Sequence, residues 1–189
     1  ILRDALSMEA TYFNQRITDL IQGAGTTSIN LDGTSTIHGI ELGVTAYLLD
    51  GLTVRAAYTF LDGEDADGVT LARRPENVAS LDIGYSFLDG AAALNLGILY
   101  TGGQQDIAFD AFYNQSRVEL DPYTLVNLAG SYRFNDHAEA FARVENLFDE
   151  RYLGDITPNL TGTALAQPAP GGRLWVNLDG EIINEGVEL

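Results

Sequence analysis

The chain has 189 residues, of which 27 are acidic and 10 basic, giving a formal net charge of −17 and a pI near 4.1. This balance provides no basic face for phosphate groups, so it excludes nucleic acid as a partner. Cysteine is absent, which rules out a disulfide framework and a thiolate metal site. There is also no run of about 18 apolar residues that would form a membrane-spanning helix.

Segments of alternating polarity recur along the chain, with the period of two that places successive strand residues on opposite faces. In chain order, the pattern predicts strands over 6–20, 37–48, 52–61, 78–87 and 93–101, a strand pair within 123–148, and a last strand over 173–182. These eight strands make the chain all-β. The opening ILRDALSMEA has no signal-peptide pattern, so we expect a mature form or a fragment.

Short and long connections alternate between these strands. Tight turns are predicted at Asp50-Gly51, at Asp89-Gly90 and at Asn135-Asp136-His137. Long loops are predicted over 23–36, 62–77, 102–122 and 149–172. Outer-membrane barrels have short periplasmic turns and long extracellular loops. We therefore expect a segment of an antiparallel up-and-down transmembrane β-barrel, with long loops on one side and tight turns on the other.

The two faces of the predicted strands support this interpretation. One face is apolar and carries aromatic residues near both strand ends, as expected where a barrel meets the two membrane interfaces. These aromatics are Tyr58, Phe60 and Tyr100 at the outer end, and Tyr85, Phe87, Tyr132 and Phe134 at the periplasmic end. The other face carries charged residues that we expect to line the wall in cross-strand ladders. They are Asp82, Arg133, Glu139, Arg143 and Glu145.

Several segments resemble the C-terminal part of TonB-dependent outer-membrane receptors. The most specific is YTLVNLAGSYRFNDHAEAFARVENLFDERY (123–152), with its ENLFD element. Others are TYFNQRITDLI, STIHGIELGVTAYL, LTVRAAYTFLDG with ARRPENVASLDIGYSF, and PGGRLWVNLDGEI. The resemblance implies that residues 1–182 are the last part of a plugged barrel of about 22 strands in the bacterial outer membrane.

The resemblance also implies function and partners. Such receptors import bulky scarce nutrients, and we expect a ferric siderophore as ligand, with cobalamin as the alternative. The expected partners are the TonB complex, acting through a plug domain not in this chain, outer-membrane lipid, and the barrel-assembly machinery. Family members usually end on an aromatic residue, whereas Gly180 and Ile182 stand at those places here and residues 183–189 form an atypical tail.

Two other functional classes remain open from the residues alone. A complete eight-stranded barrel with a structural or adhesive role is one, because eight strands suffice for closure. An outer-membrane enzyme is the other, and it needs a nucleophile beside a base. Neither His38 nor His137 has a serine at a convincing spacing. We therefore expect no catalytic residues, and we predict neither a cofactor nor a resident metal.

Candidate ligand-binding residues lie in two of the long loops. Arg73 and Arg74 close the loop 62–77, and Arg117 lies in the loop 102–122 with the aromatics Phe109, Phe112 and Tyr113. Arginine suits an anionic ligand, and aromatic rings supply contact area at little entropic cost. The alternatives are a structural role for Arg73 and Arg74 at the barrel rim, which the resemblance favours, and packing of the aromatics against neighbouring segments. The acidic residues Asp62, Glu64, Asp65 and Asp67 lack the spacing of a calcium loop, so we expect a solvated loop there.

Overall fold

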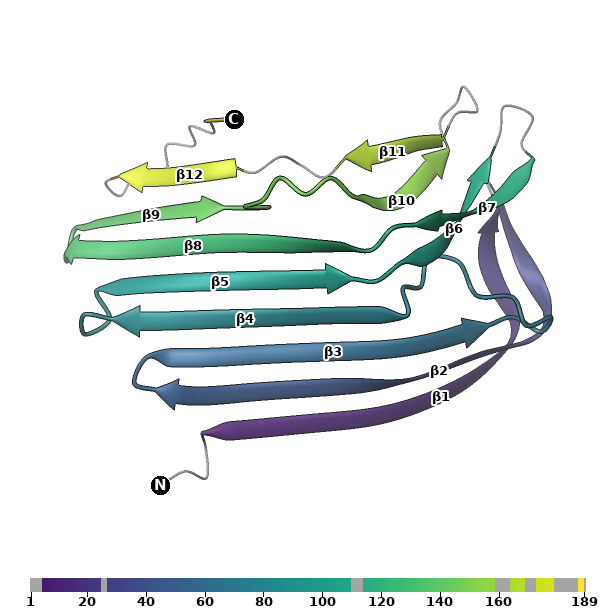
Figure 1. Ribbon diagram of the computed structural model, residues 1–189, viewed down its shortest axis with the longest axis horizontal. Helices are drawn as coiled ribbons and strands as arrows, with labels where there is room; N and C mark the ends of the chain where they lie inside the picture. The colour runs from purple at the N-terminus through teal and green to yellow at the C-terminus, as the bar shows by residue number, and fades with distance from the viewer. Residues whose placement is uncertain are drawn as a thin grey trace.

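The computed structural model describes residues 5–24, 27–109, 114–158, 164–168, 173–178 and 187–188. In these ranges every regular element is a strand (Figure 1). The bounds are β1 Leu6–Ala24, β2 Thr27–Leu49, β3 Leu52–Glu64, β4 Asn77–Phe87, β5 Ala92–Thr101, β6 Gln104–Phe109, β7 Gln115–Leu120, β8 Tyr123–Asn135, β9 Ala138–Val144, β10 Leu153–Pro158, β11 Ala164–Pro168, β12 Arg173–Leu178 and β13 Val187–Glu188. The described ranges contain no helix long and apolar enough to span a membrane.

Nine of the described strands form one sheet in the order β1-β2-β3-β4-β5-β8-β9-β12-β13, and each neighbouring pair is antiparallel. The sheet is open, because among the described strands β1 pairs only with β2. The pairs β6–β7 and β10–β11 form separate hairpins at one end of the sheet, at the right in Figure 1. The expected antiparallel up-and-down architecture is confirmed.

The tight turns all lie at the opposite end of the sheet (Figure 1). Leu49 pairs with Leu52, so Asp50 and Gly51 form a two-residue turn in which Gly51 has a φ of 81°. The turn at Asp136-His137 is equally short, since Asn135 pairs with Ala138. Asp89-Gly90 lies within a four-residue connection, because β4 ends at Phe87 and β5 begins at Ala92. The expected separation of short turns from long connections is confirmed.

The long connections contain more strand than the sequence predicted. The expected loop over 23–36 is wrong, because β1 and β2 continue through most of it as a paired hairpin. Its threonines and isoleucines favour extended structure, and the ladder offers each backbone group a partner. Within the described residues of β1 and β2, only Asp19, with a φ of 53°, and Gly33, with a φ of 90°, have a left-handed backbone. At Asp19 the register shifts, which marks a β-bulge. The loops 102–122 and 149–172 likewise contain the β6–β7 and β10–β11 hairpins.

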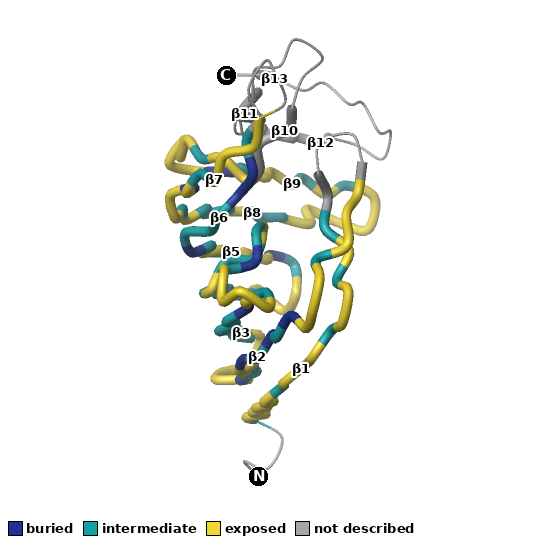
Figure 2. Tube along the Cα trace, turned by 90° about the vertical axis from the view of Figure 1, so that its right-hand side faces the viewer, coloured by how far each residue is buried: buried dark blue, intermediate teal, exposed yellow. Residues whose placement is uncertain are grey.

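The apolar face of the sheet stays exposed. Met8 is 72% exposed, Leu94 50% and Phe134 60%. Most of the length of the strands is exposed or half-buried, and few segments are buried (Figure 2). A row of this kind would be buried in a soluble domain, whereas a lipid-facing wall leaves it open. The most buried apolar residues of the described part instead include a group at or near the long connections: Ile37, Leu71, Ile107 and Leu120.

Candidate functional site

The loop 62–77 is a folded structure at the outer end of β3 and β4. One carboxylate oxygen of Asp65 accepts hydrogen bonds from the backbone N–H groups of Asp67, at 3.0 Å, and Val69, at 2.9 Å. The Asp65 N–H in turn donates to the Val69 carbonyl at 2.9 Å. Asp65 therefore closes a turn, as aspartate often does in loops. In the described ranges, no cluster of three or more histidine or acidic side chains is arranged to hold a metal ion.

Leu71 anchors this loop against the sheet. Its side chain is 1% exposed, and its N–H donates to the Gly63 carbonyl at 2.8 Å. A Cβ atom added at Gly63 would lie 3.3 Å from Leu71 Cδ1 and 3.7 Å from Ile37 Cγ1. Gly63 pairs with Ile37 on β2. Ile37 is an even number of residues from Gly39 and Glu41, so all three lie on the same face of the sheet, which is the polar face. The loop thus folds over the polar face.

Arg73 joins the loop to the hairpin β6–β7. Its Nε donates to Asp106 Oδ1 at 2.7 Å, and its backbone N–H donates to the Gln105 carbonyl, also at 2.7 Å. The Asp106 side chain is fully buried, whereas that of Arg73 is 53% exposed. The same Oδ1 accepts from the Ile107 N–H at 2.7 Å. Arg73 has a φ of 59°, a left-handed conformation unusual for a residue with a side chain, and these contacts hold it there.

Arg117 makes a second connection across the same boundary. Its Nη1 donates to the Thr70 carbonyl at 2.6 Å, and its strand position lies opposite Ile107 in the hairpin. We refer to Thr70, Arg73, Gln105, Asp106 and Arg117 together as the rim junction. Of the predicted ligand-binding residues, Arg73 and Arg117 are thus brought together here, and Arg74 is half-buried beside Arg73. Phe109 ends β6, and Phe112 and Tyr113 lie outside the described residues.

The chain beyond β9 is turned back by Asn146, in the ENLFD element. Asn146 has a φ of 51°, and its amide forms two hydrogen bonds of 2.9 Å with the backbone of Glu150, one to the carbonyl and one from the N–H. Its own N–H donates to Asn127 Oδ1 at 2.9 Å, and the Leu147 N–H donates to the Val126 carbonyl at 2.7 Å. This element therefore ends β9 and fastens the following segment to β8.

The returning segment places Tyr152 on Tyr123, a contact that the sequence did not predict. The two rings stack with their centroids 4.0 Å apart and their planes at 22°. Burial, and then the neighbouring Tyr123, raise the pKa of Tyr152 above its usual value. Tyr123 has the parity of the polar face, so alternation alone identifies its side. Tyr152 lies in a segment without periodicity, and no sequence signal indicates its position. Nearby, Gln104 Nε2 donates to the Gly154 carbonyl at 2.8 Å.

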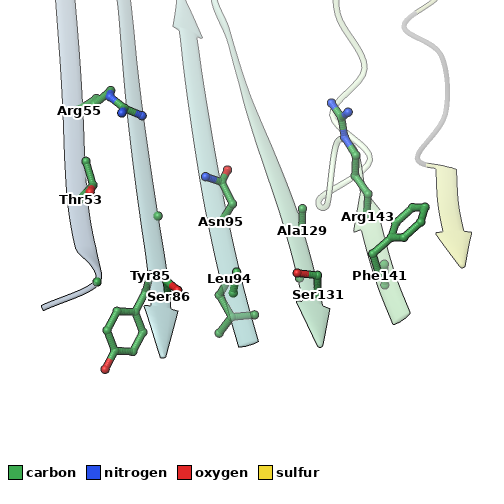
Figure 3. Close-up of a pocket in the computed structure, with 15 residues that line it drawn as sticks. Thr53, Arg55, Tyr85, Ser86, Leu94, Asn95, Ala129, Ser131, Phe141 and Arg143 are labelled. Atoms are coloured by element: carbon green, nitrogen blue, oxygen red, sulfur yellow. The ribbon is translucent and has the colours of Figure 1, made fainter. Parts of the chain in front are cut away.

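The polar face of the sheet bears an open hollow of about 680 Å³ near the tight turns. Figure 3 shows Arg55 and Arg143 at its two sides, on β3 and β9, with Asn95 between them. Arg55 is paired in register with Asp82, and Arg143 Nη2 lies 2.6 Å from Glu145 Oε1. The expected charged residues therefore do share one face of the sheet. Asn95 and the small residues between the arginines leave the space open.

The two histidines lie at opposite ends of the sheet. His38 Nε2 is 3.6 Å from Asp62 Oδ2, on the paired strands β2 and β3 at the outer end. His137 lies in a tight turn, where its N–H donates to Asn135 Oδ1 at 2.8 Å. Among the described residues, neither histidine is hydrogen-bonded to a hydroxyl group, so these residues form no histidine-based nucleophile–base pair for covalent chemistry.

The sheet is antiparallel, with an apolar outer face, a charged inner face and long connections at one end. These are the features of the wall of an outer-membrane β-barrel. Residues 2–147 match the family described as TonB dependent receptor-like, beta-barrel. The chain therefore belongs to the TonB-dependent receptors of the bacterial outer membrane, as its sequence predicted.

Named relatives agree with this assignment. The chain is 32% identical over 126 residues to the vitamin B12 transporter BtuB of Photobacterium profundum, covering 66% of this chain and 19% of that protein. It is 28% identical over 129 residues to the metal-pseudopaline receptor CntO of Pseudomonas aeruginosa, covering 64% of this chain and 18% of that one. These relatives are named as a transporter and a receptor, not as enzymes, in agreement with the expectation that the chain is not an enzyme.

Solved structures show the same fold. The FpvAI–pyocin S2 complex matches with a TM-score of 0.76 at 20% identity, over 93% of this chain and 25% of that one. The ferric-catecholate import receptor Fiu of Escherichia coli K12 matches with a TM-score of 0.73 at 21% identity, also over 93% and 25%. The chain thus spans a quarter or less of the length of each of these four relatives.

Proposed function

We propose that this chain forms part of the wall and outer loops of a receptor that imports a ferric siderophore across the outer membrane. The observation that carries the proposal is the rim junction, which brings arginines from two separate connections to the outer end of the polar face. Arg73, Arg74 and Arg117 are three of only 10 basic residues in a chain of net charge −17. Arginine binds carboxylate and similar anionic groups through two parallel hydrogen bonds.

The ligand-binding set is proposed to be Arg73, Arg74, Phe109, Phe112, Tyr113 and Arg117. Arginines bind the anionic periphery of the iron complex, and the aromatic side chains of the hairpin supply apolar contact area. The relationship to the metal-pseudopaline receptor supports a metal chelate as ligand. Passage through the barrel is proposed to depend on a plug that TonB engages, in a part of the protein outside this chain. Outer-membrane lipid covers the exposed apolar face, and the barrel-assembly machinery inserts the protein.

Cobalamin is the second candidate ligand. The 32% identity to a vitamin B12 transporter favours it. Cobalamin carries few anionic groups, so its capture should depend less on arginine than capture of a ferric carboxylate or catecholate complex. The two ligands therefore predict different responses to the same substitutions, which makes them separable in one experiment.

The test is a titration of the full-length receptor, purified in detergent, with ferric citrate, ferric enterobactin and cyanocobalamin. For a ferric complex, Arg74→Ala and Arg117→Ala should each weaken binding about tenfold or more, because each removes a charge-assisted hydrogen bond worth about 1.5–3 kcal/mol. Arg16→Ala is the matched control, because Arg16 is an exposed arginine of β1 with the parity of the apolar face. Tight binding of cyanocobalamin alone, unaffected by these substitutions, would replace the siderophore assignment with cobalamin.

A further inference from the structure

Among the side chains that the structure describes, Asp106 is the only fully buried acid. A carboxylate removed from water is tolerated only where charges and hydrogen-bond donors replace its hydration. Here Arg73 Nε and the Ile107 N–H are two such donors, each at 2.7 Å from the same oxygen. Ile107 belongs to the hairpin itself, whereas Arg73 comes from the neighbouring loop, 33 residues away in sequence. The carboxylate therefore stands between two separate segments.

Two further hydrogen bonds cross the same boundary. The Arg73 N–H donates to the Gln105 carbonyl, and Arg117 Nη1 donates to the Thr70 carbonyl. Together with the buried ion pair, they attach the loop to both strands of the hairpin, since Gln105 and Asp106 lie on β6 and Arg117 lies on β7. Three points of attachment on two strands fix both the separation and the relative orientation of the two segments.

We propose that Asp106 is a positioning residue, which holds the loop 62–77 and the hairpin β6–β7 as one rigid unit and thereby sets the spacing between Arg74 and Arg117. Asp106 is too buried to contact a ligand, so its effect acts through Arg73 and the backbone. The link to ligand capture rests on the proposed function, whereas the rigid coupling of loop to hairpin does not. Without the carboxylate, Arg73 Nε loses its buried acceptor, and the hydrogen bonds that remain between the loop and the hairpin allow the two segments more relative motion.

The experiment measures the distance between spin labels on the two segments in the full-length receptor, with no ligand present. Labels are attached at Asp67→Cys and Ser116→Cys, both exposed positions. This chain contains no cysteine, and any cysteine elsewhere in the full-length receptor is replaced by serine. A double electron–electron resonance measurement should give a single narrow distance distribution in the parent. Asp106→Ala should at least double its width, and Asp106→Asn should broaden it less, because the amide oxygen still accepts both hydrogen bonds.

Control variants separate positioning from general damage. Arg73→Ala should broaden the distribution as much as Asp106→Ala while leaving the Asp106–Ile107 bond inside the hairpin intact. The double variant should be no broader than either single variant, because both break the same pair. Glu119→Ala, at an exposed acid of β7, should leave the width unchanged. Labels at Asp50→Cys and Asp136→Cys, in two turns at the other end of the sheet, should report the same distance in every variant and so show that the sheet is folded.

Unchanged width in Asp106→Ala and Arg73→Ala, or strictly additive broadening in the double variant, would overturn the proposal. The titration described above then separates it from the proposed function. If the parent receptor binds none of the three probes, the ligand assignment fails while the distance measurement still decides whether Asp106 fixes the loop. If the parent binds a ferric complex, Asp106→Ala must weaken that binding at least fivefold; unchanged affinity with a broadened distribution would overturn the positioning role.

Discussion

Leu71→Ala tests whether the loop 62–77 is fastened over the polar face. Leu71 is 1% exposed, and its side chain fills the space above Gly63 beside Ile37. Truncation of a buried leucine to alanine costs about 2–5 kcal/mol, and a loop with no other fully buried apolar side chain has little means of compensating. We take about 3 kcal/mol. Each 1.4 kcal/mol is a factor of ten in an equilibrium, so local opening of the loop should become about a hundredfold more frequent.

Hydrogen exchange read by mass spectrometry on the full-length receptor measures that opening. The Leu71 and Asp65 amides are bonded to backbone carbonyls at 2.8 and 2.9 Å, so peptides spanning 62–77 should exchange about a hundredfold faster in Leu71→Ala. Peptides from β5 should not change. Val69→Ala is the control, because Val69 lies in the same loop but is 38% exposed. Exchange that rises equally in both variants, or in neither, would refute the idea that Leu71 anchors the loop.

Three further predictions follow from the fold. Gly51→Ala should sharply reduce the yield of folded receptor, measured by outer-membrane fractionation, because an added Cβ would lie 2.0 Å from the Ser86 carbonyl oxygen at a φ of 81°. Asp50→Ala, in the same turn, should be tolerated. Equal yields of the two variants would contradict the argument. The pKa of Tyr152 should lie above its usual value, so the stability contributed by its stacked neutral ring is present below pH ~10 and is lost as pH rises through the raised pKa. A difference titration at 295 nm between the parent and Tyr152→Phe measures this ionisation. Ionisation at or below the ordinary tyrosine pKa would contradict the prediction. The 189-residue chain refolded alone in detergent should show no heat-modifiable band on a gel, because the described sheet is open at β1. A compact band that shifts only on boiling would instead favour a self-closed eight-stranded barrel.

The sheet was predictable because each of its signals is local. Alternation with a period of two assigns a face to every strand residue: it predicts Asp82 on the charged face, and the register pairs Asp82 there with Arg55. The turn at Asp50-Gly51 needs only its own left-handed glycine. The prediction of a loop over 23–36 was wrong because the deciding signal is not local. Its composition is typical of a loop, but pairing along β1 outweighs composition once a long hairpin has begun.

The rim junction could not be predicted, because its parts become neighbours only in the folded chain. Asp106 is one of 27 acidic residues, and its local sequence does not distinguish a buried carboxylate from a solvated one. Its partner lies 33 residues earlier in another connection. The arginines were identified as candidates by residue type alone. The structure adds that two of them also bind the loops to each other, so substitution of Arg73 or Arg117 changes loop geometry as well as any ligand contact.

The ENLFD element shows how a short pattern that identifies a family can have a purely structural cause. Asn146 needs a left-handed backbone, which asparagine adopts more readily than most residues, and an amide that both donates to and accepts from the Glu150 backbone. Aspartate lacks the donor, and glycine lacks both groups. The requirement for asparagine therefore follows from the turn that ends β9 and returns the chain toward Tyr123. Asn146 is committed to hydrogen bonds within the fold, so ligand recognition should be sought in the connections that the turn positions.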